Sequence, residues 1–489
     1  MKKNLKAVFS AFLALIMAFA ALPVSTLPSL EAETAKAEKN AIEPYWTVPE
    51  GYNVNDYTKC VEFWEQTDEN GVKNGEKLSE SYDPNDPGTW GERYFDWTGV
   101  NNERRVSSIL FGSSGQAWSV QLIGALDVSG FSELYALSCW QAETLESIDA
   151  SNCPKLVWID CTSSGISTLN IENSALIAEL DCSLNNLTAL DVSGCTALQS
   201  LACSYNHLTE LDISGCCELE SLYCSENNLT ELDVMQNTAL WLLGCTSNNL
   251  TELDVIQNTA LQHLYCSDNN LVELDVMQNT ALKHLYCDNN NLVELDVNRN
   301  TELRSLDCSG NNLIELDVTN NTELKQLYCY ANNLTSLDLS NNSMLAYDNI
   351  RAEGFGYVGY ASNYYEYDDM HYVFIYAYPV NSAVFEGFYD ENGALIAEGE
   401  WSDENEGYSY GFYGNATGTI IARFSGGALP GDIDGSGSVS TADAITTLRL
   451  AMQLLDGSGM NTDAADMDGN GSITLADAIL ILRTAMGLA

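Results

Sequence analysis

The stretch Leu261–Val276 reads L-Q-H-L-Y-C-S-D-N-N-L-V-E-L-D-V, and variants of it return every 21 residues along the middle of the chain. Its cysteine recurs in register at Cys161, Cys182, Cys203, Cys224, Cys245, Cys266, Cys287, Cys308 and Cys329. Its third leucine recurs at Leu187, Leu208, Leu229, Leu250, Leu271, Leu292, Leu313 and Leu334. A unit repeated at a fixed period indicates a solenoid, because each unit buries its apolar side only by stacking on the next one. We therefore predict stacked repeats over residues 121–345.

The phrase L-x-x-L-x-C-x-x-N-x-L resembles the leucine-rich repeats, with cysteine in place of one leucine. The resemblance implies a mainly β solenoid with one short strand per repeat on its concave side. Within the strand, the period of two places Leu264 and Cys266 inward and His263 and Tyr265 outward.

The cysteines of the main column are expected to stay reduced. Neighbouring strands lie about 4.8 Å apart, whereas a disulfide needs Cβ atoms about 3.8 Å apart. Free buried cysteine behaves as a small apolar residue, so we predict a column of thiols in the core. Cys153, Cys195 and Cys216 occupy a second column, and Cys60 stands alone.

Two polar columns accompany the cysteines. The first consists of Asn185, Asn206, Asn227, Asn248, Asn269, Asn290, Asn311 and Asn332, and Ser164 interrupts it. A buried amide donates and accepts hydrogen bonds along a stack of backbones. The segment L-D-V predicts a second strand, on the convex side, whose acidic column is Asp191, Asp212, Asp233, Asp254, Asp275, Asp296, Asp317 and Asp338. These carboxylates either hold cations or accept hydrogen bonds from the N–H groups of the following turn.

Aromatic and imidazole side chains at outward strand positions form a candidate ligand surface. They are Trp158, Tyr223, His263, Tyr265, His284, Tyr286 and Tyr328. Aromatic rings suit sugar rings or protein partners, although tyrosine is also simply a good strand residue. Two histidines one repeat apart would need a further ligand to bind a metal.

The regions outside the repeats have their own signals. Lysines 2, 3 and 6 precede an apolar run over residues 7–24, and the motif A-K-A comes later, at 35–37. This pattern predicts a signal peptide over 1–37, with a retained membrane anchor as the alternative. Residues 38–120 contain an amphipathic segment at 55–66 and then W-T-G-V and R-V-S-S-I, an order similar to the N-terminal caps of leucine-rich repeat proteins. A cap covers the apolar end of the first repeat.

Residues 346–425 change to a Tyr- and Gly-rich composition with alternating apolar residues and an Asn-Gly turn at 392–393. This pattern predicts a small all-β domain. Its F-E-G-F-Y-D motif and closing A-R-F resemble the small β repeats beside leucine-rich repeats in bacterial surface proteins, which implies a spacer or adhesion element. Residues 426–430 read as a linker.

Two loops near the C-terminus have the spacing of a calcium site. Asp432, Asp434, Ser436, Ser438, Ser440 and Asp443 fit positions 1, 3, 5, 7, 9 and 12 of such a loop, and Asp466, Asp468, Asn470, Ser472, Thr474 and Asp477 repeat them 34 residues later. Ca²⁺ takes six to eight oxygen ligands, and glycine at position 6 allows the sharp turn. We predict two Ca²⁺ ions. Each loop leads into a helix, and we expect Ile445, Leu448, Ile479 and Leu482 on the buried faces.

These loops are EF-hand-like, but they end in Asp and no adequate helix precedes them, so residues 431–489 resemble a type I dockerin instead. The resemblance implies calcium-dependent folding and docking to a cohesin module of a scaffoldin, in the cellulosomes of anaerobic bacteria. Transferred by position, the cohesin-binding residues are Thr441, Ala442, Arg449, Leu475, Ala476 and Arg483. Thr441 and Leu475 differ, which puts a symmetric docking mode in doubt.

The formal charge of −49 argues against nucleic acid and anionic membranes as partners. We expect an exported protein that is free of the membrane once its signal peptide is removed.

The leading hypothesis is a non-catalytic secreted binding or adhesion protein on a cellulosome, with the repeats recognising a plant polysaccharide or a protein. The alternatives are a polysaccharide-degrading glycoside hydrolase and a structural or inhibitor-like surface protein. The acidic residues fall into repeat columns rather than a carboxylate pair, and no H-E-x-x-H or G-x-S-x-G motif is present, so we expect no enzyme activity.

Overall fold

The computed structural model describes residues 46–90, 94–100, 103–111, 121–365, 370–380, 383–402, 407–413, 417–426, 431–433, 439–455, 460, 462–467 and 472–486. The predicted signal segment 1–37 and linker residues 427–430 lie outside this part of the chain. So do the predicted calcium ligands Asp434, Ser436, Ser438, Asp468 and Asn470. No helix among the described residues is long and apolar enough to cross a bilayer.

The region before the repeats covers the end of their main sheet. It contains α3 (Val54–Trp64), α4 (Asn74–Leu78), η3 (Pro87–Thr89), β1 (Phe95–Val100) and β2 (Glu103–Leu110). Helix α3 begins at Val54, after its N-cap Asn53, whose side chain accepts a hydrogen bond from the backbone N–H of Asp56, and it buries Tyr57, Cys60 and Trp64. Strand β1 is antiparallel to β2, and β2 pairs in parallel with β4, the first inner strand of the repeats. The inner sheet of the repeats therefore continues into β2 and β1 and does not end at β4.

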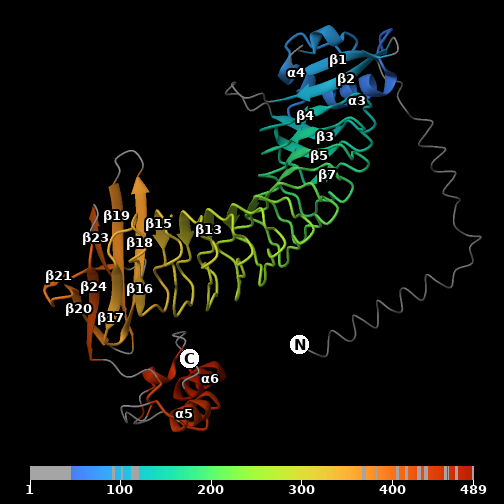
Figure 1. Cartoon of the computed structure of the whole chain (residues 1–489). Coiled ribbons are helices and arrows are strands. Elements are labelled where there is room, and N and C mark those ends of the chain that lie inside the picture. Colours follow the sequence, from blue (N-terminus) through green and yellow to red (C-terminus); the bar gives the residue numbers. More distant parts are fainter. Residues whose placement is uncertain are drawn as a thin grey trace, which may run out of the picture. The chain divides into compact units, whose positions relative to one another are not determined.

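The repeats stack into a curved solenoid with one column of short parallel strands on its inner side (Figure 1). These strands are β4 (Ala136–Ser138), β6 (Trp158–Asp160), β8 (Glu179–Asp181), β9 (Ser200–Ala202), β10 (Ser221–Tyr223), β11 (Leu242–Gly244), β12 (His263–Tyr265), β13 (His284–Tyr286), β14 (Ser305–Asp307) and β15 (Gln326–Tyr328). Their register matches the sequence repeat, so that His263 pairs with His284 and Tyr265 pairs with Tyr286. Leu264 is fully buried and its two strand neighbours are half-buried, as the alternation predicts.

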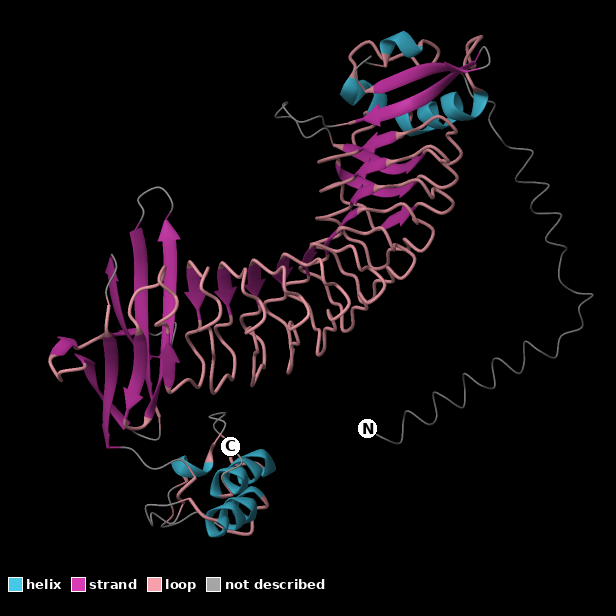
Figure 2. Cartoon of the chain, in the orientation of Figure 1, coloured by secondary structure: helices cyan, strands magenta, loops and turns pink. Residues whose placement is uncertain are grey.

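The predicted second strand at every L-D-V segment is wrong for most repeats. The opposite side carries only β3 (Leu122–Asp127), β5 (Glu143–Asp149) and β7 (Thr168–Asn170), and then β16 (Ser336–Asp338), while the described segments between β7 and β16 form no strand there (Figure 2). The curvature explains the difference, because the outer side of a bent stack is longer than the inner side. Successive L-D-V segments are then too far apart for a ladder that requires about 4.8 Å between strands.

Columns of buried thiols and amides fill the interior between the two sides. The cysteines of the main column are fully buried, and all of the cysteines in the chain are free thiols. The second column holds Ser174 between Cys153 and Cys195, and beyond Cys216 it continues as Asn237, Asn258, Asn279, Asn300, Asn321 and Asn342. Each of these residues is almost fully buried, so the interior combines two amide columns with the thiol column.

The structure predicts that the native protein has one reactive thiol. Cys217 is exposed, whereas the other cysteines are buried, and burial raises the pKa of a column thiol such as Cys266 well above its usual range. Because thiolates react and buried thiols do not, titration with a disulfide reagent should modify one cysteine of the native protein and all of them after denaturation. Cys217→Ser should remove the native signal. Rapid modification of several thiols in the folded Cys217→Ser variant would contradict the buried column.

Residues 346–426 form a two-sheet cap on the last repeat rather than a freestanding β domain. Their strands are β17 (Asn349–Glu353), β18 (Gly356–Tyr365), β19 (Met370–Pro379), β20 (Ala383–Asp390), β21 (Leu395–Ala397), β22 (Glu400–Ser402), β23 (Gly407–Tyr413) and β24 (Thr419–Gly426). Strand β18 pairs antiparallel with β15 and continues the inner sheet, and β17 pairs with β16 (Figure 2). The core between the two sheets includes Tyr360, Ile375 and Phe388, all fully buried. The cap therefore closes the apolar end of the solenoid.

The C-terminal region has its own small core. It contains α5 (Thr441–Ala451), η4 (Asp463–Ala465) and α6 (Leu475–Ala485). Ile433, Ala444, Ala465 and Ile481 form its buried cluster. This cluster is built from both halves of the repeated loop-helix unit, so neither half has a complete core alone.

Candidate functional site

The first predicted calcium loop is closed by the carboxylate of Asp443. Its Oδ1 accepts a hydrogen bond of 3.0 Å from the backbone N–H of Ile433, near the start of the loop. Its Oδ2 accepts hydrogen bonds from the backbone N–H and the hydroxyl of Ser440, at 2.8 and 2.7 Å. Ser440 is the N-cap of α5, so this carboxylate, only 1% exposed, joins the loop's beginning to the helix at its end.

The second loop repeats this arrangement atom for atom. Asp477 Oδ1 accepts from the backbone N–H of Met467 at 2.8 Å, and its Oδ2 accepts from the N–H and hydroxyl of Thr474 at 2.7 and 2.8 Å. Asp477 is fully buried, and Thr474 caps α6. The 34-residue repeat of the sequence is therefore a structural repeat as well.

The donor set of the two loops fits Ca²⁺. Buried carboxylates stand at position 1 of the first loop, Asp432, and at position 12 of both loops. Hydroxyl oxygens of Ser440 and Thr474 stand at position 9. Carboxylate and hydroxyl oxygens are the hard ligands that Ca²⁺ prefers, and a bound cation offsets the cost of burying these anions. Within the described residues no three carboxylate, imidazole or thiol groups gather around one point, since the middle positions of both loops lie outside that part.

The helices after the loops expose apolar faces, and the prediction that these faces are buried is wrong. Ile445 is 51% exposed and Ile479 is 50% exposed, Leu482 is also exposed, and Leu448 is half-buried. The smaller residues Ala444 and Ala478 are buried instead. Small side chains allow α5 and α6 to pack closely, which turns the larger ones toward solvent.

The exposed apolar residues repeat at helical spacing in both halves. They are Ile445 and Met452 on α5 and its C-terminal end, with the half-buried Leu448 between them, and Leu475, Ile479, Leu482 and Met486 on α6 and its end. The six residues predicted to bind cohesin are all exposed: Thr441, Ala442, Arg449, Leu475, Ala476 and Arg483. An apolar surface of this kind is available for contact with a partner.

On the repeats, the structure brings four of the seven predicted surface residues into one cluster. The rings of His263 and His284 stack with centroids 4.9 Å apart and planes at 10°. The rings of Tyr265 and Tyr286 lie 5.2 Å apart, and Tyr265 Oη is 3.3 Å from His263 Nδ1. This cluster extends along β12 and β13 on the inner face.

The other three predicted residues lie apart from this cluster along the strand column. Tyr223 is exposed on β10 and faces Gly244 on the next strand, and Trp158 is on β6. Tyr328 is on β15, separated by the β14 strand. Sequence reasoning missed Trp241, which is 38% exposed. Its ring makes an edge contact with the ring of His263, with the centroids 5.6 Å apart. Trp241 precedes β11, so the alternation within the strand does not predict its orientation. In the sequence, only its large aromatic side chain could have indicated a place on the ligand surface.

Burial and nearby cations act on the two histidines. Burial and Lys283 lower the pKa of His263. Burial, His263, Arg304 and Lys283 lower the pKa of His284. Both imidazoles are therefore neutral near pH 7, and within the described residues no third ligand joins them.

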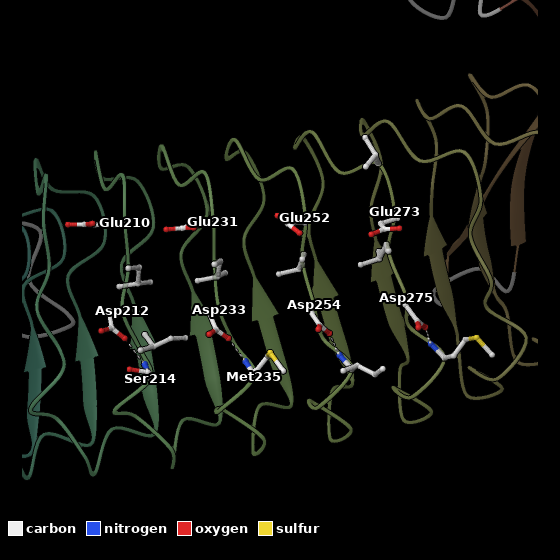
Figure 3. A pocket seen from close by; sticks show the side chains of 18 of the residues that line it. Glu210, Asp212, Ser214, Glu231, Asp233, Met235, Glu252, Asp254, Glu273 and Asp275 are labelled. Atoms are coloured by element: carbon white, nitrogen blue, oxygen red, sulfur yellow. Dashed lines mark hydrogen bonds between the residues drawn. The ribbon is translucent and has the colours of Figure 1, made fainter. Parts of the chain in front are cut away.

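The acidic column on the opposite side caps turns. In each of its eight members Oδ1 accepts a hydrogen bond from the backbone N–H two residues later, as Asp233 does from Met235. This confirms the turn-capping interpretation. The column borders a groove of about 1460 Å³. Figure 3 shows its two acidic rows, with Glu231 and Glu252 in one and Asp233 and Asp254 in the other.

Comparisons with known proteins agree with this geometry. Residues 430–484 match the family model of the dockerin type I domain. The chain is therefore a β-solenoid protein whose repeats resemble leucine-rich repeats and whose residues 430–484 match a type I dockerin domain. No curated protein matches it.

Among solved structures, the functional domain of InlJ from Listeria monocytogenes, which includes a cysteine ladder, is 25% identical with a TM-score of 0.42, over 60% of this chain and 76% of that one. YopM, a leucine-rich effector protein from Yersinia pestis, is 23% identical with a TM-score of 0.36, over 44% of this chain and 62% of that one. The leucine-rich repeat protein LIC12759 of Leptospira interrogans is 19% identical with a TM-score of 0.33, over 45% of this chain and 82% of that one.

Proposed function

We propose that this chain is a secreted, non-catalytic binding protein that docks through its dockerin onto a cohesin module of a scaffoldin and presents its repeats to a ligand. The docking is calcium-dependent, with one Ca²⁺ ion in each loop. In this role the protein is a cellulosome component and is located outside the cell.

The apolar face repeated on α5 and α6 is the observation that carries this proposal. Ile445 and Ile479 are equivalent under the 34-residue repeat and are about equally exposed. A domain with so small a core gains nothing from exposing large apolar residues unless a partner covers them. The match to the dockerin type I family supports a cohesin as that partner.

The repeats supply the second binding surface. The cluster around His263 and Tyr286 is half-buried, held in register by the strand ladder, and lies on the inner face of the solenoid. A rigid scaffold that presents aromatic rings is suited to recognition of a polysaccharide or a protein. The acidic column of the repeats is occupied with turn capping, which supports binding rather than catalysis.

Binding to an immobilised type I cohesin tests the proposal. The full chain should bind in millimolar calcium and be released by chelator, because calcium holds the dockerin folded. The double variant Ile445→Asp/Ile479→Asp should lose about a hundredfold or more in affinity, since it places two charges in the apolar contact. Val384→Asp, at a residue 63% exposed in the cap, is the matched control and should bind normally. Equal binding with and without calcium, or no effect of the double variant, would reject the proposal.

A further inference from the structure

Three of the few basic side chains in this acidic protein lie in register on the inner face of the repeats. Lys283, Arg304 and Lys325 each stand just before a strand, on three successive repeats. The backbone N–H of Arg304 bonds to the carbonyl of Lys283 at 2.8 Å, and that of Lys325 bonds to the carbonyl of Arg304 at 2.9 Å. The backbones at consecutive positions are thus one strand spacing apart, about 4.8 Å. We call these three residues the basic rail.

The far side of the same strands carries carboxylates. Asp307 ends β14, and Asp288 comes two residues after the end of β13. Burial raises the pKa of Asp307 to about 6 and also raises the pKa of Asp288. The Oδ1 atom of Asp288 accepts a hydrogen bond from the hydroxyl of Ser267. We call Asp288 and Asp307 the acidic rail.

The floor between the rails consists of rings and short polar groups. Outward positions of β12 to β15 hold histidine, tyrosine, serine, glutamine and aspartate, and no aliphatic residue. Ser305 Oγ lies 3.1 Å from Tyr286 Oη and 3.2 Å from Gln326 Oε1. Such a floor offers hydrogen bonds and ring contacts along its length, but no socket for the apolar anchors on which peptide recognition depends.

We propose that the face between the basic and acidic rails binds a linear polyuronate, a polysaccharide with one carboxylate on each sugar. The polymer lies across the strands of β12 to β15, its carboxylates directed to the basic rail and its hydroxyls to the acidic rail. This inference rests on the proposed binding function of the repeats and names its ligand class.

Charge and polarity favour this ligand over the alternatives. The overall charge of −49 repels polyanions from the protein as a whole. A row of cations on one face would therefore attract a polyanion to that face alone. Asp288 and Asp307 accept hydrogen bonds from hydroxyl donors, which sugars have and acidic peptides lack along their backbone. A neutral polysaccharide would gain no attraction from the charges of the basic rail.

The test uses the full chain without added calcium, because Ca²⁺ cross-links the carboxylates of polyuronates, and measures binding by isothermal titration or affinity electrophoresis. The probes are polygalacturonate, its fully methyl-esterified form and polyglutamate. Polygalacturonate should bind at least about tenfold more tightly than the other two, and its affinity should fall with added salt. The ester has the same backbone without charge, and polyglutamate has the charge without sugar.

The double variant Lys283→Gln/Arg304→Gln should lose about tenfold in affinity for polygalacturonate, the effect of removing two charge contacts. Arg299→Gln is the matched control, because this exposed arginine lies in the same stretch of repeats but in the turn after the L-D-V segment. Equal binding of the ester, equal binding of polyglutamate, or an equal loss in Arg299→Gln would overturn the proposal. Cohesin binding is measured on the same variants. If the polyuronate inference alone is wrong, cohesin binding remains intact, whereas a wrong docking function would appear as a loss of cohesin binding.

Discussion

Replacing Asp477 by alanine should unfold the dockerin and abolish both calcium binding and cohesin docking. The carboxylate accepts three hydrogen bonds, from the N–H of Met467 and from the N–H and hydroxyl of Thr474. Alanine leaves these donors without their acceptor in a fully buried position. The cost is about 3–5 kcal/mol before any loss of the metal is counted. A small domain has a total stability of about 5–15 kcal/mol, and the variant also loses a predicted Ca²⁺ ligand.

The matched control is Asp338→Ala in the repeats. Asp338 is exposed and makes one such bond, from its Oδ1 to the N–H of Ser340, so its removal should cost about 1 kcal/mol or less. Calcium titration monitored by circular dichroism measures the helix content of the dockerin in each variant. Asp443→Ala should behave like Asp477→Ala, because the two carboxylates make equivalent bonds. Retained helix content and calcium affinity in Asp477→Ala would contradict the role given to this residue.

Strict periodicity makes the strand faces and the thiol column predictable from the sequence. A strand places alternate residues on opposite faces, so the spacing alone determines that Leu264 points inward and His263 outward. The thiol column is predictable for the same reason, because Cys266 takes an inward position in a strand of a stack with fixed spacing. The turn-capping aspartates are predictable from local chemistry, since an Asp side chain reaches the N–H two residues on without help from tertiary structure.

Tertiary geometry accounts for the features that the sequence does not predict. The L-D-V segments have the composition of strands, but curvature, which arises only from the whole stack, separates them. Alternation identifies the strands over 346–426 but does not identify their partners β15 and β16. Ile445 and Ile479 have the helical spacing of core residues. An exposed apolar face and a buried one show the same spacing in the sequence, so the spacing does not distinguish them. Trp241, Lys283, Arg304 and Lys325 share one position of the 21-residue repeat, but only the stacked structure shows that this position lies close to the rings of His263 and His284.

Replacing Asn269 by alanine should destabilise the repeats strongly. Its Oδ1 accepts a hydrogen bond from the N–H of Leu250 at 3.0 Å. Its Nδ2 lies 3.0 to 3.2 Å from the carbonyl oxygens of Cys245, Cys266 and Ser267. The side chain therefore joins two successive repeats and is 7% exposed. Its loss leaves several buried backbone groups unpaired, at a cost of about 3–5 kcal/mol.

The second amide column provides the matched controls for this prediction. Asn279 makes two hydrogen bonds, both from Nδ2, and its buried Oδ1 accepts none. Asn279→Ala removes that unpaired acceptor together with the two bonds, so it should cost about half as much. Asn279→Cys restores the residue present at Cys195 and Cys216 in the same column and should cost least. Urea denaturation monitored by circular dichroism gives the order of the three free energies of unfolding. We expect Asn269→Ala to lower the free energy of unfolding more than Asn279→Ala does. An equal or larger loss in Asn279→Ala would show that burial alone, and not hydrogen bonding between repeats, determines the stability of the stack.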